Sequence, residues 1–249
     1  MNTSVHYDTL LGPVYSWMLG DIQTAFARSA AEIAEMHLPS PSRGLAVDLG
    51  AGFGLHAIPM AKAGYSVTAI DNCQLLLDEL RSLAGSLPIT VVNDDLLNFR
   101  SHAKAPLGVV LCAGDTLTHL PNLRSVEQLL MDVSESLAVG GMFAATFRDY
   151  VSKPLEGGAR FILVRRDENR ILTCFLEYGP EVVTVHDSLT ERDAGQWVQK
   201  VSSYPKLRLA PDWVEARLQS LGLKSRRETA PSGMVRIVGT KDKDPACIA

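Results

Sequence analysis

The sequence predicts an α/β fold, in which a doubly wound, mostly parallel sheet carries an inserted antiparallel sheet. From residue 44 to residue 147, short apolar runs that read as strands alternate with amphipathic, helix-length segments. Between about residues 158 and 204 the pattern changes to strand-like runs separated by turn residues. Alternating strands and helices are typical of parallel sheets, whereas strands joined by tight turns pair in the antiparallel sense.

Before the sheet, residues 1–43 are expected to form a helical cap. Asp21 is a plausible N-cap for a helix over residues 22–34, because apolar side chains recur there at helical spacing. Pro39, Pro41 and Ser42 end this helix and form a linker. The aromatic side chains of the cap, among them Tyr15 and Trp17, either pack in a core or form a lid over a binding pocket.

The parallel sheet is expected to use five strands, over residues 44–49, 65–70, 89–93, 107–113 and 142–147. Three helices are expected to connect them. The first ends near residue 63 and contains Pro59, which indicates a kink or a late start. The second covers residues 73–84. The third covers residues 122–138 and is expected to close at Gly140-Gly141.

The inserted sheet is predicted from runs rich in β-branched and aromatic residues over 161–166, 170–178 and 182–186, with 196–204 as a fourth strand. Pro211 then opens a helix to residue 221, which Gly222 ends. Residues 223–228 and 234–240 read as a closing antiparallel pair. The predicted division is therefore a cap (1–43), a core (44–150), an inserted region (151–205), the end of the core (206–241) and a tail (242–249).

Composition narrows the class of partner. The 249 residues, with 46% hydrophobic and 21% charged side chains, describe an ordinary globular protein with one good core. The net charge of -4 offers no basic footprint for nucleic acid. No stretch reaches the roughly 18 apolar residues of a membrane span, and the first eight residues do not resemble a signal peptide.

Four cysteines, at positions 73, 112, 174 and 247, lack the spacing of metal ligands, so no metal site is expected. Reduced thiols are the simplest interpretation and favour a cytoplasmic protein.

The most informative stretch is a glycine loop after the first strand. Glycines occupy positions 50, 52 and 54, where they permit positive φ and let a ligand approach the main chain. A helix that starts near Gly54 would direct free N–H groups at that ligand. The dinucleotide pattern G-x-G-x-x-G is broken, because its third glycine would fall at Leu55.

Asp48 adds a charge argument. A carboxylate two residues before the first glycine would face the same cleft and repel a pyrophosphate, but would attract an amine. An amino acid joined to a nucleoside satisfies both ends of such a site, with its amine towards Asp48 and its carboxylate towards the helix N-terminus. S-adenosylmethionine is such a molecule.

The pattern Asp48-x-Gly50-x-Gly52-x-Gly54 resembles the first motif of the Rossmann-like (class I) S-adenosylmethionine-dependent methyltransferases. Residues 114–120 resemble the fourth-motif loop of small-molecule N-methyltransferases, including the glycine N-methyltransferase type. The loop lacks the Asn/Asp-Pro-Pro-Tyr signature of nucleic-acid or protein amide methylation. The resemblance implies a seven-stranded Rossmann-like sheet, S-adenosyl-L-methionine as cofactor with S-adenosyl-L-homocysteine as product, and a small-molecule acceptor.

Two acidic residues are expected to hold the nucleoside. Asp71, about 20 positions after the glycine loop, is placed to accept from both ribose hydroxyls, or else caps the next helix. The resemblance implies that Asp95 accepts from the adenine amine, although Asp94-Asp95 also fits an exposed turn. The expected cofactor contacts are Asp48, Gly50, Ala51, Gly52, Gly54, Asp71, Asn72, Asp95, Leu96, Ala113 and Gly114.

On the acceptor side, the candidate catalytic residues are Asp115, His119 and Arg148. Asp115 holds a cationic amine or caps its loop, and His119 contacts substrate or makes a structural hydrogen bond. Arg148 binds an acidic acceptor or pairs with Asp149 or Glu177. Substrate contacts are expected from Tyr15, Trp17, Asp115, His119, Arg148 and Tyr150.

The sequence thus predicts transfer of a methyl group to an N or O nucleophile of a small molecule by in-line displacement. Two rival interpretations are a regulatory protein that binds S-adenosylmethionine or S-adenosylhomocysteine without catalysis, and a nicotinamide oxidoreductase, which Asp48 and Leu55 disfavour. A homodimer is left open, and neither nucleic acid nor membrane is expected as a partner.

Overall fold

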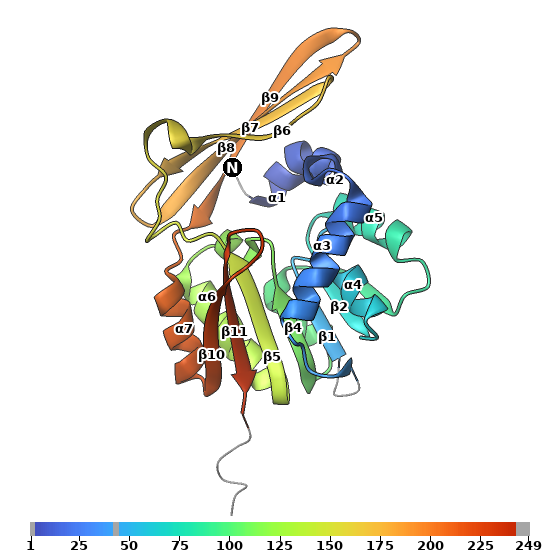
Figure 1. Ribbon diagram of the computed structural model, residues 1–249, viewed down its shortest axis with the longest axis vertical. Coiled ribbons are helices and arrows are strands. Elements are labelled where there is room, and N and C mark those ends of the chain that lie inside the picture. Colours follow the sequence, from blue (N-terminus) through green and yellow to red (C-terminus); the bar gives the residue numbers. More distant parts are fainter. Residues whose placement is uncertain (1–2, 42–44, 243–249) are drawn as a thin grey trace, which may run out of the picture.

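In the computed structural model, which describes residues 3–41 and 45–242, a central sheet flanked by helices lies below a second, separate sheet (Figure 1). Of the residues discussed above, Ser42, Gly44 and Cys247 fall outside the described ranges. No helix of the described ranges is long and apolar enough to span a membrane.

The central sheet has seven strands in the order β10-β11-β5-β4-β1-β2-β3. Strands β1 to β5 pair in parallel, whereas β11 runs antiparallel to both β5 and β10. This is the predicted doubly wound, mostly parallel sheet. The strands are β1 (Leu45–Leu49), β2 (Val67–Asp71), β3 (Ile89–Asn93), β4 (Leu107–Cys112), β5 (Leu137–Phe147), β10 (Leu223–Thr229) and β11 (Val235–Lys241).

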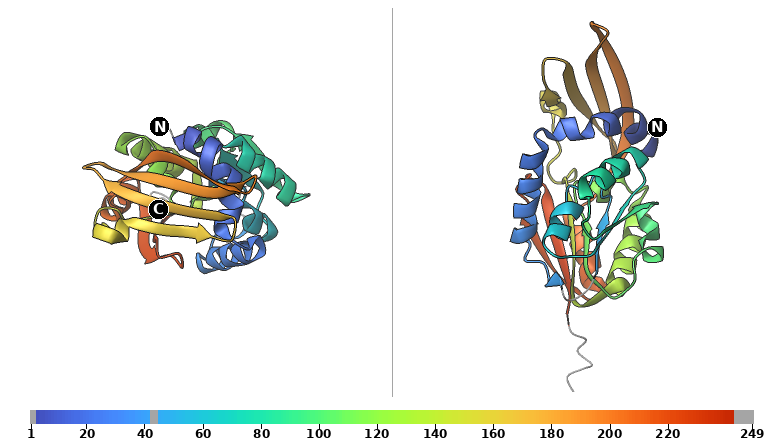
Figure 2. Two further views of the ribbon diagram at one scale, coloured as in Figure 1. Left: turned by 90° about the horizontal axis from the view of Figure 1, so that it is seen from above. Right: turned by 90° about the vertical axis from the view of Figure 1, so that its right-hand side faces the viewer.

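Helices cover both faces of this sheet, because alternate strand residues point to opposite sides. On one face, α3 (Ile22–Glu35), α4 (Ala57–Lys62) and α5 (Gln74–Ala84) pack on residues such as Ala46 and Val67. On the other, α6 (Leu123–Ser136), α7 (Pro211–Ser220) and the 3₁₀ helix η4 (Leu96–Ser101) pack on residues such as Val47 and Phe143. The right panel of Figure 2 shows the two helical layers on opposite sides of the sheet.

The second sheet has four antiparallel strands in the order β6-β7-β8-β9. It lies across the top of the central sheet, as the left panel of Figure 2 shows. A short 3₁₀ helix, η6 (Gly157–Arg160), precedes it. The strands are β6 (Phe161–Arg166), β7 (Arg170–Tyr178), β8 (Val182–Asp193) and β9 (Gln196–Leu207). The third strand is seven residues longer than the predicted 182–186, because its ladder with β9 continues to the pair Asp193↔Gln196.

The N-terminal segment lies between the two sheets (Figure 1). It consists of α1 (Thr3–His6), a π turn η1 (Tyr7–Leu11), a 3₁₀ turn η2 (Gly12–Val14) and α2 (Tyr15–Leu19). Apolar side chains of η1 and η2 pack on Leu172 and Leu189 of the second sheet. The N-terminal residues therefore connect the second sheet to the core.

Asp21 caps α3 as expected, since its carboxylate accepts the N–H of Thr24 at 2.7 Å. The helix after the glycine loop begins late, at Ala57, which places Pro59 in the first turn, where a helix tolerates proline. The prediction that Gly140-Gly141 closes the third connecting helix was wrong. Helix α6 ends at Ser136 and β5 begins at Leu137, opposite Leu107 of β4.

The two glycines instead lie at an irregularity within β5. Gly140 has φ of 78°, and a Cβ on Gly141 would lie 2.8 Å from the carbonyl oxygen of Leu107. The glycines are needed here because the strand bends tightly against its neighbour, which is a common use of glycine inside strands.

Candidate functional site

A cavity of about 500 Å³ lies at the carboxyl ends of β1, β2, β3 and β4. Ligands bind at this edge in open α/β sheets. Its floor comes from the core, including Gly50, Gly52, Asp71 and Asp95. The N-terminal segment contributes Thr3, Ser4, Tyr7 and Tyr15, and the second sheet contributes Val182, Pro205 and Leu207.

The glycine loop that opens this cavity has a backbone that other residues adopt only with strain. Gly50 and Gly52 have φ of 74° and 53°. A Cβ on Gly50 would lie 2.4 Å from Cγ2 of Thr116, so the loop after β4 packs directly on the main chain. Main-chain atoms of the loop are thereby presented to the cavity.

Asp71, at the end of β2, accepts hydrogen bonds from the Gly52 N–H at 2.8 Å and the Cys73 N–H at 2.9 Å. It therefore fixes the glycine loop and supports the residue that precedes α5, while its role toward the ribose hydroxyls stays a prediction. Burial raises the pKa of Asp71, although these N–H groups oppose the shift. A carboxylate has about four acceptor sites, so the side chain retains capacity for a ligand.

Of the two neighbouring carboxylates after β3, Asp95 faces the cavity and Asp94 does not. Asp95 and Leu96 line the cavity, and Asp95 also accepts the Leu97 N–H at 2.9 Å. Asp94 is bonded to His102 and Asn98, and these hydrogen bonds lower its pKa to about 2.

The structure brings most of the predicted cofactor contacts to this cavity: Gly50, Ala51, Gly52, Asp71, Asn72, Asp95, Leu96, Ala113 and Gly114. Asp48 and Gly54 do not line it. Gly54 lies under α5, where a Cβ would be 2.3 Å from Cδ1 of Leu80. Asp48 is 1% exposed, so its charge does not face the cleft as expected.

A second cavity, of about 750 Å³, lies beneath the second sheet. Charged and aromatic side chains on its wall include Arg148, Tyr150, Asp187, Tyr204 and Lys206. It adjoins the first cavity, because five residues line both: Tyr7, Tyr15, Leu55, His56 and Gly114.

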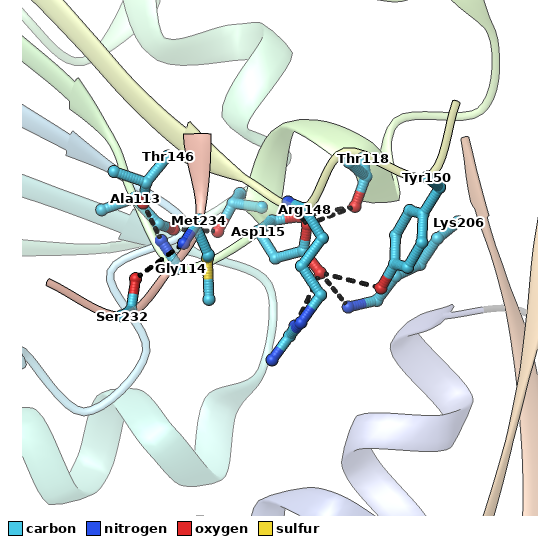
Figure 3. A network of polar contacts seen from close by, with 11 residues as sticks. Ala113, Gly114, Asp115, Thr118, Thr146, Arg148, Tyr150, Lys206, Ser232 and Met234 are labelled. Carbon is cyan, nitrogen blue, oxygen red and sulfur yellow. Dashed lines mark hydrogen bonds and ion pairs between the residues drawn. The ribbon is translucent and has the colours of Figure 1, made fainter. Parts of the chain in front are cut away.

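Asp115 binds several side chains that line the second cavity, and Figure 3 shows this network of polar contacts. Its carboxylate accepts from the Arg148 backbone N–H at 2.9 Å, the Arg148 guanidinium at 3.0 Å and the Lys206 ammonium at 2.5 Å. The Tyr150 hydroxyl adds a bond of 3.3 Å. Since Asp115 is buried and lines neither cavity, it acts on other residues and does not contact a ligand directly.

These partners determine the charge of Asp115. Burial alone would raise its pKa, but Lys206 and Arg148 lower it to about 2. The same pairing raises the pKa of Arg148 against the opposing effect of burial. The Arg148 side chain remains 54% exposed. The cluster therefore presents a fixed, hydrogen-bonded guanidinium to the second cavity.

The remaining predicted acceptor contacts differ in position. Tyr15 lines both cavities, and burial raises its pKa to about 12. His119 lines the first cavity and stacks on Tyr204 at 5.4 Å between ring centroids. Burial and nearby Lys206 lower the pKa of His119 to about 3. Trp17 lines neither cavity, because its indole N–H donates to Asp167 in the turn between β6 and β7.

Sequence reasoning missed Lys206, Tyr204 and His56. Ser202, Tyr204 and Lys206 alternate along the buried face of β9, so a lysine in the inward-facing register was the available signal. His56 follows the last glycine of the loop by two residues, which places it beside the same cavity. The two β9 residues were not apparent without knowing which face of that strand is buried, and His56 was not apparent because nothing in its local pattern distinguishes it.

Comparison with known proteins agrees with this architecture. A family model described as "Methyltransferase domain" matches residues 46–141. The DesVI structure from Streptomyces venezuelae has a TM-score of 0.76 at 19% identity, over 92% of this chain and 97% of that one. The seven-stranded sheet with its separate four-stranded sheet is the Rossmann-like methyltransferase fold. No curated protein sequence matches the chain.

Two further structures have the same fold. The CcbJ methyltransferase from Streptomyces caelestis has a TM-score of 0.73 at 18% identity, over 88% of this chain and 90% of that one. CalS10 from Micromonospora echinaspora is described as an amino pentose methyltransferase and was solved with S-adenosylmethionine bound. It has a TM-score of 0.74 at 17% identity, over 94% of this chain and 97% of that one. None of these three is described as a glycine N-methyltransferase, so that finer resemblance stays a prediction.

Proposed function

We propose that this protein is an S-adenosylmethionine-dependent methyltransferase that acts on an N or O nucleophile of a small molecule. The observation that carries the proposal is the pair of adjoining cavities. One lies over the glycine loop at the carboxyl ends of the parallel strands, the other lies under the second sheet, and they share five lining residues. A methyl donor and its acceptor need such a pair of sites with contact between them.

The residues of the first cavity suit this cofactor. Asp71 would accept from the ribose hydroxyls, and Asp95 with the Leu96 N–H would hold the adenine. The main chain of the loop between Gly50 and Gly52 would lie against the amino-acid portion. The buried Nδ1 of His119, which lines this cavity, has no hydrogen-bond partner among the described residues, which fits a site completed by a ligand or by water.

When bound, the cofactor supplies an activated methyl group on a sulfonium with a neutral leaving group. The protein must then align the acceptor with that methyl and exclude water. Such alignment can lower a barrier by roughly 7–11 kcal/mol in favourable cases. Tyr15, Tyr150 and Arg148 would orient the acceptor, while Asp115 would hold Arg148 and Lys206 in position.

An acceptor of small-molecule size is supported by the volume of the second cavity and by the neighbouring structures. CalS10 is described as an amino pentose methyltransferase, and KedS8 from Streptoalloteichus as a sugar N-methyltransferase, with 13% identity and a TM-score of 0.73. A purely regulatory protein is not favoured, since it would need only the first cavity. An exposed guanidinium held by a buried carboxylate is an acceptor-side feature.

Titration calorimetry with S-adenosylmethionine, S-adenosylhomocysteine and NAD tests the cofactor. We expect the two sulfur compounds to bind and NAD not to bind. Transfer of a tritiated methyl group to a panel of small amines, phenols and carboxylates then tests the reaction. Binding of NAD alone would refute the proposal. Firm cofactor binding with complete inactivity across the panel would instead support the regulator.

The Asp71→Ala variant tests the site. Loss of charge-assisted hydrogen bonds, at about 1.5–3 kcal/mol, is expected to weaken S-adenosylhomocysteine binding at least tenfold. Asp78→Ala is the matched control, because Asp78 lies on the exposed side of α5 and pairs with Arg81 and Gln74. An unchanged dissociation constant for Asp71→Ala would remove the ribose assignment.

A further inference from the structure

The boundary between the two cavities contains one nitrogen base. Of the five residues that line both, Leu55 and Gly114 are apolar or lack a side chain, and Tyr7 and Tyr15 carry phenols. The fifth is His56, which immediately precedes α4 at the end of the glycine loop. Its backbone is therefore fixed by the same loop that forms the first cavity.

The imidazole of His56 is free to bind a ligand. Its side chain is half-buried, and within residues 3–41 and 45–242 neither ring nitrogen has a hydrogen-bond partner. Burial lowers the pKa of His56 to about 4, so the ring is neutral near pH 7. A neutral imidazole has one nitrogen that accepts a hydrogen bond.

The other polar groups at this boundary are weaker hydrogen-bond acceptors than an imidazole nitrogen, or are already bonded. Burial raises the pKa of both Tyr7 and Tyr15, so both are neutral phenols. The carboxylate of Asp115 already accepts hydrogen bonds from Arg148 and Lys206. His119 lines the first cavity only, and its ring is stacked on Tyr204. Among the residues shared by both cavities, His56 is thus the one nitrogen acceptor.

We infer that His56 accepts a hydrogen bond from the N–H or O–H of the methyl acceptor and thereby directs the lone pair of that nucleophile at the methyl group. This inference rests on the proposed function, since the sulfonium must lie where the two cavities meet. The acceptor would accordingly be a neutral amine or a hydroxyl compound that keeps a hydrogen on its nucleophilic atom.

The chemistry explains why an acceptor group is useful there. The nucleophile forms a bond to the methyl carbon while the carbon–sulfur bond breaks and its electron pair goes to sulfur. Positive charge develops on the nucleophile, so a hydrogen bond from its N–H or O–H to the imidazole strengthens during the transfer. The proton can leave to solvent afterwards, and His56 need not become charged.

Sinefungin tests this without knowledge of the natural acceptor. It carries an amine at the position of the sulfonium methyl, where its N–H groups would donate to the imidazole that the inference places beside the methyl, whereas S-adenosylhomocysteine carries nothing there. Calorimetry should give both dissociation constants for the wild type, His56→Leu, His56→Gln and the control His186→Ala. His186 pairs with Glu177 in the second sheet and lines neither cavity.

We expect His56→Leu to weaken sinefungin binding about tenfold or more, which is the scale of a charged hydrogen bond. The dissociation constant of the same variant for S-adenosylhomocysteine should stay within twofold of the wild-type value. His56→Gln, which keeps an acceptor, should restore part of the lost sinefungin affinity, and His186→Ala should change neither dissociation constant.

A purely structural role for His56 would weaken the binding of both ligands equally. Equal shifts, or an unchanged sinefungin affinity in His56→Leu, would overturn the inference. If His56→Leu does not fold, His56→Ala, which also lacks an acceptor, takes its place, and a sinefungin affinity unchanged from the wild type would overturn the inference.

Failure of the proposed function gives a different result. If the wild type binds neither sinefungin nor S-adenosylhomocysteine, the methyltransferase proposal itself is refuted, and the role of His56 falls with it.

Discussion

At the scale of single residues, Asp48 shows how a correct motif can carry an incorrect physical reason. Its position before the glycines predicted a charge facing the ligand. The structure instead buries it behind the loop, and burial, with a contribution from Asp71, raises its pKa to about 7. A largely buried carboxyl that is half protonated near neutrality attracts an amine far less than an exposed carboxylate would.

This burial predicts an unusual dependence of stability on pH. The unfolded Asp48 titrates near 3.8 and the folded one near 7, so the folded chain binds more protons between these values. Stability contributed by the neutral carboxyl is therefore lost as pH rises through this window. Asp48→Asn removes the effect. Its free energy of unfolding relative to the wild type should rise by about 2–3 kcal/mol from pH 5 to pH 8.

Urea unfolding at the two pH values measures this difference, and Asp78→Asn, at an exposed site, should show none. A relative stability of Asp48→Asn that is the same at pH 5 and pH 8 would contradict the burial of a neutral carboxyl.

Residues whose position follows from local pattern could be predicted from the sequence. Asp71 and Asp95 each end or follow a strand, and both line the first cavity. The role of Asp115 could not be predicted, because its main partner, Lys206, lies 91 residues away on a different sheet. Local pattern located the cofactor side, whereas the acceptor side depends on contacts between distant strands.

At the scale of elements, the sequence predicted most helices and strands to within a few residues, because their apolar periodicity is strong. The prediction for β3 was confirmed at both ends. The error at Gly140-Gly141 arose because a glycine pair signals a helix end and a strand irregularity equally well. Pairing of Leu137 with Leu107 decided between them, and that contact is not local.

The N-terminal segment is held by contacts that no periodicity predicts. His6 is fully buried, its Nδ1 lies 2.8 Å from the Ser202 hydroxyl and its Nε2 lies 3.0 Å from Asp187. Its ring stacks on Tyr204 at 4.2 Å between centroids. One side chain of α1 thus joins the N-terminal segment to β8 and β9.

His6→Ala should release this segment. The substitution removes the imidazole that the buried Asp187 contacts, and this should lower the free energy of unfolding by about 1–3 kcal/mol. Limited proteolysis should cleave residues 3–19 faster than in the wild type. His186→Ala is the control, since its partner Glu177 is 63% exposed. Unchanged cleavage within residues 3–19 would show that the apolar contacts of η1 and η2 suffice.

At the scale of the whole molecule, three parts of the chain close the first cavity. The core supplies its floor, and the N-terminal segment and the second sheet supply its remaining walls. Thr3, Ser4 and Tyr7 from one end of the chain meet Pro205 and Leu207 from the other half at the same space. A ligand there contacts all three parts, so its binding must couple them.

Hydrogen exchange can measure this coupling. A ligand at about 100 times its dissociation constant stabilises the bound state by about 2.7 kcal/mol, which is the upper limit of any protection it confers. S-adenosylhomocysteine should therefore slow exchange by up to about 100-fold in residues 3–19, whose opening exposes the cavity. Strand β10, at the far edge of the central sheet, lines neither cavity and should gain less protection.

The Asp71→Ala variant is a control for this experiment. At the same S-adenosylhomocysteine concentration, the protection of residues 3–19 should fall in proportion to the weaker binding of the ligand. Protection confined to the glycine loop would show that the N-terminal segment moves independently of the bound ligand.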